Sequence, residues 1–425
     1  MKRRSMWFAR FLFPFLLAAG SLPLRAADTC APEHQPAGKR AIGKWITADN
    51  WLAPGNQRTS LSMAEIFMPS IRLRASSAAV PLRPTTRQLD LDKLTLADPA
   101  DEKSRSVASL LDTRLYADAI LVMHNGRILA ERQWHGARAE QPRLLLQAGR
   151  PVLSLLGAMS IAQGKLAPER SVVRYVPALS SNVALRRLSV QRLLEGDDRY
   201  AWLPEELAQW RNAGGWGSEP SPGGVRDWLS QSERWERPLH EILPDAAEGS
   251  PDDDLLAWVL AESHGAPLAS VFCEQLLLRM RPEQPVAWLT DVAGNELAGG
   301  LVLSLRDFAR LGQLLIEARA TPTRSRIPGW FVETLTASSR AAGMPALSGL
   351  RKGSDLRYGF VRLGGAANRI AILGAHGTSL YIDFDRRLVV ALYATHPQVR
   401  SPLQLASLER LWDAFGAAVP AVRKR

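Results

Sequence analysis

The sequence of 425 residues predicts an α/β fold in which helices flank a sheet whose first and last strands are neighbours. Strand-like runs occur near both ends of the chain, at 119–131 and 369–393, and a helical pattern fills about 189–278 between them. Because one sheet has to take up both sets of strands, we expect the helical part to be an inserted subdomain.

The N-terminus has the layout of a secretory signal. Basic residues precede an apolar run from Phe11 to about Leu24, so we expect residues 1–26 to be a signal peptide that is cleaved near Ala26. The run is shorter than the roughly 20 residues that cross a bilayer, and we expect no stable membrane span. An uncleaved anchor is the alternative. The protein is therefore predicted to be exported, either periplasmic or secreted.

Charge and motifs exclude several classes of function. The formal net charge is +11, but five of the positive charges lie within residues 1–26, and the other basic residues are scattered among acidic ones. This distribution predicts a solvated surface and no nucleic-acid partner, although a weak attraction to anionic cell-wall polymer stays open. Because phosphate loops, dinucleotide fingerprints and His-Glu-x-x-His are absent from the sequence, we expect no cofactor and no metal.

The elements follow in chain order. Residues 27–110 are rich in Pro, Ser and Arg, which predicts an extended segment draped over a domain of residues 111–420. Asn125-Gly126 supplies the positive φ angles of a tight turn, so the runs on either side of it predict a β-hairpin. Residues 152–162 are apolar on nearly every side, with Pro151 at the expected first position of a helix, and predict a buried central helix.

The inserted stretch at about 189–278 is helical in pattern but interrupted by short polar and Gly-rich segments, among them Asp252-Asp253-Asp254. It contains five tryptophans that predict either packing between amphipathic helices or a groove for sugar or peptide, namely Trp202, Trp210, Trp216, Trp228 and Trp235. Beyond it, the patterns predict a helix at 305–316, strands at 369–373, 379–383 and 388–393, and a final helix at 402–419.

Two cysteines remain after the signal, Cys30 and Cys273. Export to an oxidising compartment would permit a single disulfide between them. Cys273 lies in an apolar, helix-like stretch at 268–278, so a buried free thiol is the alternative.

Several segments, taken in order, resemble the β-lactamase-related serine hydrolases, and within them the branch of 6-aminohexanoate-dimer hydrolase and similar secreted esterases. The segments are 50–58, 116–126, 164–177, 255–260, 288–300, 305–313 and 374–377, and together they span about residues 45–400. The most specific is Leu305-Arg-Asp-Phe-Ala-Arg-Leu-Gly-Gln313, followed by Gly374-Ala-His-Gly377. The resemblance implies a β-lactamase/transpeptidase-like fold with an antiparallel sheet.

The resemblance also implies acyl transfer through a serine. A serine hydroxyl is a poor nucleophile near neutral pH, so a neighbouring base has to accept its proton while backbone N–H groups stabilise the oxyanion. The family provides these groups as Ser-x-x-Lys at the start of a buried helix, a Tyr-x-Asn-like element of the helical lobe, and a Lys-Thr-Gly or His-Thr-Gly stretch on a strand.

In this chain most of the implied catalytic positions are replaced. Spacing from Gly136 and Gly164 places Gln147-Ala148-Gly149-Arg150 where Ser-x-x-Lys belongs, and none of the eight lysines has a serine three positions before it. Counting back from Leu255 places Glu248 at the tyrosine position, and the third motif persists as Ala375-His376-Gly377-Thr378.

These replacements predict the loss of the family chemistry. Glutamine has no nucleophilic oxygen of useful basicity, and arginine, with a pKa above roughly 12, stays protonated. We expect an Arg150–Glu248 ion pair with Gln147 and His376 at its edge, because a buried arginine without a partner would cost several kcal/mol. The ligand cleft is predicted to comprise Gln147, Arg150, Glu248, Ser250, His376, Gly377 and Thr378.

Three hypotheses about function follow. The chain is a catalytically inactive protein that binds a small molecule, a cell-wall fragment or a protein partner through the inherited cleft; or an active amide or ester hydrolase with a relocated nucleophile; or an envelope scaffold whose interaction surface lies outside the cleft. Ser250 with His376 as its base is the candidate pair for the second hypothesis. Ser154, one turn after Arg150, is interpreted as a packing hydroxyl.

Overall fold

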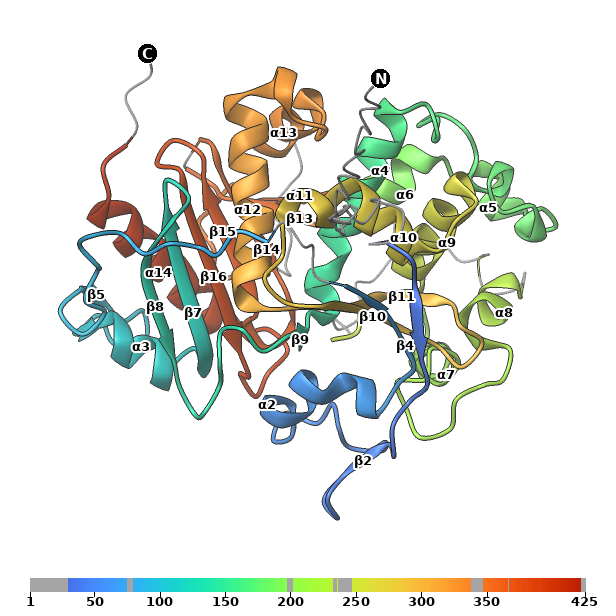
Figure 1. The fold of residues 1–425 in the computed structure, drawn as a ribbon, viewed down its shortest axis with the longest axis horizontal. Coiled ribbons are helices and arrows are strands. Elements are labelled where there is room, and N and C mark those ends of the chain that lie inside the picture. The colour runs from blue at the N-terminus through green and yellow to red at the C-terminus, as the bar shows by residue number, and fades with distance from the viewer. Residues whose placement is uncertain are drawn as a thin grey trace, which may run out of the picture.

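The computed structural model describes residues 30–74, 79–196, 202–231, 235, 247–337, 347–365 and 367–421. The predicted signal peptide lies outside these residues. In the described part, two antiparallel sheets and the helices around them form the body of the molecule (Figure 1).

The larger sheet confirms the predicted meeting of the two chain ends. Its order is β12-β13-β14-β15-β16-β7-β8, and β16 pairs antiparallel with β7 from Leu388 opposite His124 to Ala394 opposite Ala117. The strands are β7 (Ala117–His124), β8 (Arg127–Gln133), β12 (Asp355–Arg357), β13 (Phe360–Arg362), β14 (Arg369–Leu373), β15 (Ser379–Asp383) and β16 (Leu388–Ala394). The predicted hairpin forms, with Asn125 and Gly126 at φ angles of +52° and +74° in its turn.

Both faces of this sheet are buried, which explains why its central strands are apolar without alternation. Along β7, Leu121 and Met123 belong to the core on one face, whereas Ile120 and Val122 belong to the core on the other. Helix α12 (Leu305–Ala320) covers the first face, and α3 (Val107–Thr113) and α14 (Pro402–Ala418) cover the second (Figure 1).

The close packing of α12 depends on a glycine. A Cβ atom at Gly312 would lie 2.8 Å from a methyl group of Val389 on β16, so any side chain there would push the helix off the sheet. On the opposite face, the rings of Tyr381 and Trp412 stack with centroids 5.0 Å apart.

The smaller sheet corrects the prediction of an extended segment at 27–110. Its order is β1-β4-β10-β11-β9, so this segment supplies two of its strands. The strands are β1 (Glu33–Gln35), β4 (Ser70–Leu73), β9 (Arg143–Leu144), β10 (Val286–Thr290) and β11 (Glu296–Leu303). A short apolar run is enough to form β4, because only Ile71 and Leu73 supply apolar side chains to the core and Arg72 between them is exposed. The segment also forms α2 (Gln57–Ser60), η1 (Leu61–Ile66), a β2–β3 hairpin (Ala41–Ile42 with Ile46–Thr47) and the strands β5 (Thr95–Ala97) and β6 (Ser104–Ser106).

Helices pack beside the smaller sheet, and those from α6 to α10 lie in the stretch with the predicted helical pattern. They are α4 (Arg150–Ala162), α5 (Val183–Arg187), α6 (Val190–Glu195), α7 (Pro204–Ala213), α8 (Gly224–Ser230), α9 (Pro251–His264), α10 (Leu268–Phe272) and α11 (Leu278–Met280), with a π-helical turn at Cys273–Leu277. Helix α13 (Gly329–Thr336) follows α12.

The five tryptophans form no groove, because every one of them is buried. They pack against one another and against the N-terminal segment: the ring of Trp202 lies 4.9 Å from that of Trp235, and Trp51 stacks on Trp216. The alternative of helix packing is therefore correct.

In the described residues, no single helix is long and apolar enough to cross a membrane. The segments Pro251–His264 and Leu268–Met280 pass that test only together, and they are bent by 76° relative to each other.

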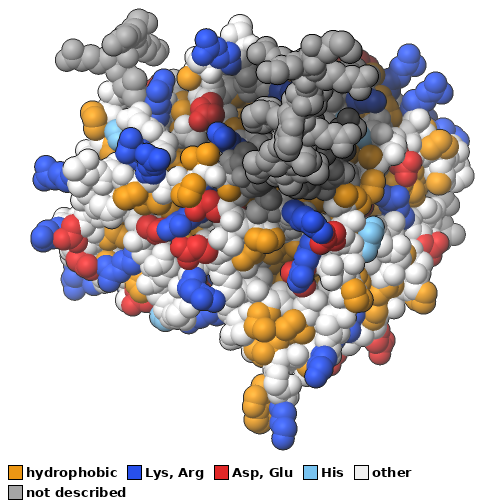
Figure 2. Space-filling view, viewed as in Figure 1, with side chains coloured by type: hydrophobic (Ala, Val, Ile, Leu, Met, Phe, Trp, Pro, Cys, Tyr) orange, Lys and Arg blue, Asp and Glu red, His pale blue; other side chains and the backbone are white. Residues whose placement is uncertain are grey.

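Figure 2 shows acidic and basic side chains interspersed over the visible face, as the scattered charges of the sequence predicted.

Cys30 and Cys273 form a disulfide, so the alternative of a free thiol is wrong. The bond joins residues 243 positions apart and ties the start of the described chain to the π-helical turn after α10.

Removal of this disulfide should destabilise the fold. A crosslink that closes so long a loop restricts the unfolded chain, and its loss typically costs about 2–5 kcal/mol. We expect urea denaturation of the Cys30→Ala/Cys273→Ala variant to give a free energy of unfolding lower by this amount. Reductant should lower the stability of the wild type and leave that of the variant unchanged. Equal stabilities of wild type and variant would show that the crosslink contributes nothing.

Candidate functional site

The position implied for the nucleophile lies in a 3₁₀ turn, Leu146–Gly149, directly before α4. Leu146 is buried and has a φ of +51°, which is a strained conformation for a bulky residue. The turn is held by close packing: a Cβ atom at Gly149 would lie 2.9 Å from the carbonyl oxygen of Ala298, and one at Gly374 would lie 2.8 Å from Cβ of Ala148. The start of α4 is thus wedged between β11 and the 374–378 segment.

The side chain of Arg150, at the lysine position, is buried in a hydrogen-bonded network. Its Nε donates to the Asp253 carboxylate at 2.6 Å, and its Nη2 donates to the carbonyl oxygens of Leu193 and Leu194 at 2.9 and 3.1 Å. Nη1 donates to the hydroxyl of Ser154. Both charged side chains are nearly inaccessible, at 5% and 4% exposed, so this is a buried ion pair.

The predicted Arg150–Glu248 ion pair is wrong. The Glu248 carboxylate pairs with the Arg211 guanidinium of α7 at 2.7 Å. The backbone carbonyl of Glu248 packs closely on Gly299, because a Cβ atom added there would lie 2.3 Å from the carbonyl oxygen. Burial raises the pKa of the Glu248 carboxyl, and the Arg211 guanidinium partly opposes this effect. The reason for the error is the start of α9: Ser250 is the N-cap, so Glu248 precedes the helix and Asp253 is the residue that faces α4.

The three aspartates that we interpreted as an interruption of the helical pattern instead form the first turn of α9. Ser250-Pro251-Asp252-Asp253 is a capping box with Pro at the first helical position, and acidic residues are favoured there by the helix dipole. Each aspartate has a separate partner: Asp252 accepts from Nε1 of Trp202, Asp253 from Arg150, and Asp254 from Nε1 of Trp210 and the Ala298 backbone N–H.

Gln147 occupies the serine position and is half-buried. Its Oε1 accepts from Nη2 of Arg400 at 2.9 Å. Its backbone N–H donates to the carbonyl oxygen of Ala247 at 3.0 Å. An amide that already donates to a carbonyl is not available to stabilise an oxyanion.

Ser250 and Ser154 both have structural contacts. The Ser250 hydroxyl caps α9 by accepting from the backbone N–H of Asp253 at 3.3 Å. The Ser154 hydroxyl accepts from Arg150 and donates to the Leu194 carbonyl at 3.2 Å, in agreement with its interpretation as a packing residue.

His376 is buried, and both of its ring nitrogens are engaged. Nδ1 lies 2.8 Å from the His396 carbonyl oxygen, so it carries the proton and donates. Nε2 lies 2.8 Å from Nε2 of Gln57, which also donates to the Leu52 carbonyl, so the imidazole accepts there. Burial lowers the pKa of His376 and favours this neutral tautomer. With neither nitrogen open, His376 cannot act as a base for Ser250.

The predicted cleft residues are thus only partly brought together. Gly374 donates its N–H to the Thr378 carbonyl at 2.8 Å and packs on Ala148, so this end of the motif lies beside the start of α4. Gly377, three residues after Gly374, packs near Gln404 and Ala394 instead. His376 faces α2 and the 396–400 segment.

Sequence reasoning missed three residues that decide this geometry, namely Asp253, Arg400 and Gln57. The capping signal of α9 would have identified Asp253 as a first-turn residue. Gln57 and Arg400 reach the site through contacts 319 and 253 positions apart, and neither has a local signal.

In the described residues, no group of three or more His, Cys, Asp or Glu side chains is placed to hold a metal ion.

The chain is similar to known proteins in sequence and in fold. No family model matches the chain. The 6-aminohexanoate-dimer hydrolase of Paenarthrobacter ureafaciens is 22% identical over 367 residues, which cover 83% of this chain and 88% of that protein. Among solved structures, a putative 6-aminohexanoate-dimer hydrolase from Bacillus anthracis superposes with a TM-score of 0.74 at 18% identity, covering 90% of this chain and 99% of that one.

A class C β-lactamase is more distant, with a TM-score of 0.51 and 12% identity over 72% of this chain and 93% of that one. These likenesses confirm the predicted β-lactamase/transpeptidase-like fold. They also confirm the resemblance to the 6-aminohexanoate-dimer hydrolase branch.

The Arg150–Asp253 pair should be strongly coupled. Arg150→Met and Asp253→Asn each leave one buried charge without its partner, so each should lower the free energy of unfolding by about 3–5 kcal/mol. The double variant should lose clearly less than the sum of the two, because no charge is then left unpaired. Urea denaturation of all four proteins measures this coupling. Arg410→Met, which breaks an exposed pair with Glu102, is the control and should cost under about 1 kcal/mol. Additive losses would argue against the network.

Asp254 should make stability depend on pH. Burial raises the pKa of its carboxyl to about 7, whereas an unfolded aspartate titrates near about 4. Between these values the folded state holds a proton that the unfolded chain has lost, so this contribution to stability decreases as pH rises, by up to about 1.4 kcal/mol per pH unit.

The stability of the wild type relative to Asp254→Asn should therefore decrease from pH 4.5 to 7 and stay level above that. Urea denaturation at four pH values measures it, with the exposed Asp227→Asn as the control for loss of a charge. A difference that does not change with pH would contradict the raised pKa.

Proposed function

We propose that this chain, which has the fold of the β-lactamase-like serine hydrolases and a 6-aminohexanoate-dimer hydrolase among its relatives, is a catalytically inactive protein that binds a ligand through the inherited cleft. The observation that carries this proposal is the buried network of Arg150. A guanidinium in ion contact with Asp253 and bonded to two carbonyls keeps its proton, so it cannot activate a nucleophile.

The position of Gln147 supports the proposal independently. An acyl-transfer site needs a nucleophilic oxygen and an N–H group directed at the developing oxyanion. Here the side chain is an amide, and the backbone N–H donates to the Ala247 carbonyl. Nucleophile, base and one oxyanion donor are thus replaced together.

The alternative, a hydrolase with a relocated nucleophile, has no comparable support. Ser250 caps α9, and both nitrogens of His376 have partners. A Ser–His pair would need both side chains to leave these contacts.

The cleft offers polar groups to a ligand. The amide of Gln147 is half-buried and is held by Arg400, so it presents hydrogen-bonding groups in a fixed orientation. Such an arrangement favours a ligand with amide and carboxylate groups. The 6-aminohexanoate dimer, which appears in the name of the relative, and a muropeptide from the cell wall both have these groups.

Export is part of the proposal. The basic and apolar N-terminal run supports it, and so does the Cys30–Cys273 disulfide, because such bonds persist in oxidising compartments. A protein partner in the envelope would then compete for the same cleft.

Binding and chemistry can be separated in one set of measurements. A labelled penicillin and a fluorophosphonate should leave the purified protein unlabelled, and calorimetry should detect saturable binding of the 6-aminohexanoate dimer or a muropeptide. Gln147→Ala should weaken this binding, whereas the substitution Gln163→Ala, at an exposed glutamine directly after α4, should not. Labelling that disappears in Ser250→Ala would support the active hydrolase instead, and no binding of either compound would argue against the cleft.

Restoring the missing motif tests the role of the surroundings. In Gln147→Ser/Arg150→Lys, the Asp253 carboxylate should hold the new lysine in its charged form, and Ala247 should still occupy the backbone N–H. We therefore expect no hydrolysis of a p-nitrophenyl ester above the rate of the wild type. Turnover that requires both substitutions would show that the oxyanion donor and the base can still be assembled.

A further inference from the structure

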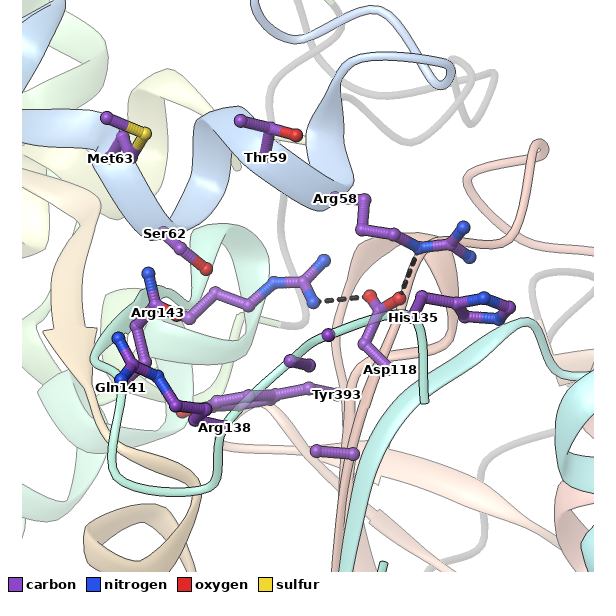
Figure 3. Close-up of a pocket in the computed structure, with 13 residues that line it drawn as sticks. Arg58, Thr59, Ser62, Met63, Asp118, His135, Arg138, Gln141, Arg143 and Tyr393 are labelled. Atoms are coloured by element: carbon purple, nitrogen blue, oxygen red, sulfur yellow. Dashed lines mark hydrogen bonds and ion pairs between the residues drawn. The ribbon is translucent and has the colours of Figure 1, made fainter. Parts of the chain in front are cut away.

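A second cavity lies outside the predicted cleft. It has a volume of about 240 Å³ and is bounded by α2, η1, the loop between β8 and β9, and the starts and ends of strands in both sheets (Figure 3). None of the residues predicted for the cleft lines it. Its polar lining residues are Arg58, Thr59, Ser62, Asp118, His135, Arg138, Gln141 and Arg143.

The cavity contains an excess of positive charge. Arg58 and Arg143 approach the carboxylate of Asp118 from opposite sides, at 2.6 and 2.5 Å (Figure 3). Arg138 lines the cavity as a third guanidinium, and Asp118 is the single acidic side chain among the lining residues. The lining therefore holds three guanidinium groups and one carboxylate.

Several donors in this lining are unused within the described part of the chain. Arg143 is 4% exposed, yet its Nε has no hydrogen-bond partner there, although Nη1 and Nη2 bond to Asp118 and the Ala394 carbonyl. Arg58 uses its Nε and Nη2 for Asp118 and Thr395, which leaves Nη1 open. The side chains of Arg138 and Ser62 have no hydrogen bond or ion pair to other described residues, and Figure 3 shows the Ser62 hydroxyl directed toward Arg143.

A purely structural role explains only part of this arrangement. The Arg58–Asp118 and Arg58–Thr395 contacts hold α2 against the larger sheet, and one guanidinium would neutralise Asp118 for that purpose. The buried Arg143 already pairs with Asp118. Arg58, which is 38% exposed, therefore adds a second positive charge that has no carboxylate of its own, and an anion in the cavity would compensate it.

We propose that this cavity binds a compact anion that carries a carboxylate or phosphate group. Guanidinium groups bind both kinds of oxyanion through paired N–H donors, and hydroxyl groups beside them supply further donors. The ligand has to be small, because the volume admits a few heavy atoms beyond the anionic group. The positive lining excludes cationic ligands and disfavours neutral ones.

Direct binding measurements test the site. Inorganic phosphate and acetate are titrated into the full-length protein by calorimetry at constant ionic strength, with chloride as the balancing anion. We expect saturable binding of at least one of them. Tighter binding of phosphate assigns a phosphate ligand, and tighter binding of acetate assigns a carboxylate.

Variants connect that binding to this cavity. Arg58→Gln and Arg138→Gln should each weaken it about ten-fold or more, since a hydrogen bond to a charged group contributes roughly that factor. Arg187→Gln, which removes an exposed arginine from α5, causes the same change in net charge and should leave the affinity unchanged.

Thr59→Val keeps every charge and removes one lining hydroxyl, so it provides a further variant if loss of Arg58 impairs folding; it should weaken binding less than the arginine variants. The proposal is overturned if neither anion binds saturably, or if binding is the same in Arg138→Gln as in Arg187→Gln.

Discussion

The buried ion pair between Arg150 and Asp253 is the constraint on which the rest of the site depends. It joins the first turn of α4 to the first turn of α9, and Arg150 also donates to the carbonyls of Leu193 and Leu194 in the last turn of α6. A guanidinium out of water requires a carboxylate and further acceptors, and here both are provided. The same pair supports the proposed loss of the family chemistry, because it holds the side chain at the implied lysine position in its charged form.

Close packing fixes the backbone at the start of α4. Gly149, Gly299 and Gly374 permit backbone approaches that no side chain would allow, and Leu146 is held with a positive φ directly before Gln147. Strain of this kind persists only where the surroundings enforce it. The surroundings therefore hold this turn in place, and the N–H group of Gln147 donates to the Ala247 carbonyl.

Arginine outnumbers lysine throughout the sequence, and the structure shows two separate uses for it. In the cleft, Arg150 is neutralised by Asp253. In the cavity beside α2, Arg58 and Arg143 share Asp118, which leaves positive charge for an external anion. The difference lies in the ratio of guanidinium to carboxylate groups. One guanidinium with one carboxylate forms a structural ion pair, whereas two guanidinium groups that share one carboxylate can still attract an anionic ligand.

The sequence by itself determined the hairpin and the last three strands, the meeting of the two chain ends in one sheet, and the residues Gln147 and Arg150 at the positions where the family resemblance implies serine and lysine. Periodicity, turn residues and motif spacing are local signals, and they were sufficient for those conclusions. Only the tertiary structure decided which acid pairs with Arg150, that His376 faces Gln57, and that Cys30 bonds to Cys273. These partners are distant in sequence, and Glu248 and Asp253 are equally charged, so the choice between them depends on where α9 begins and which side chain it directs at α4.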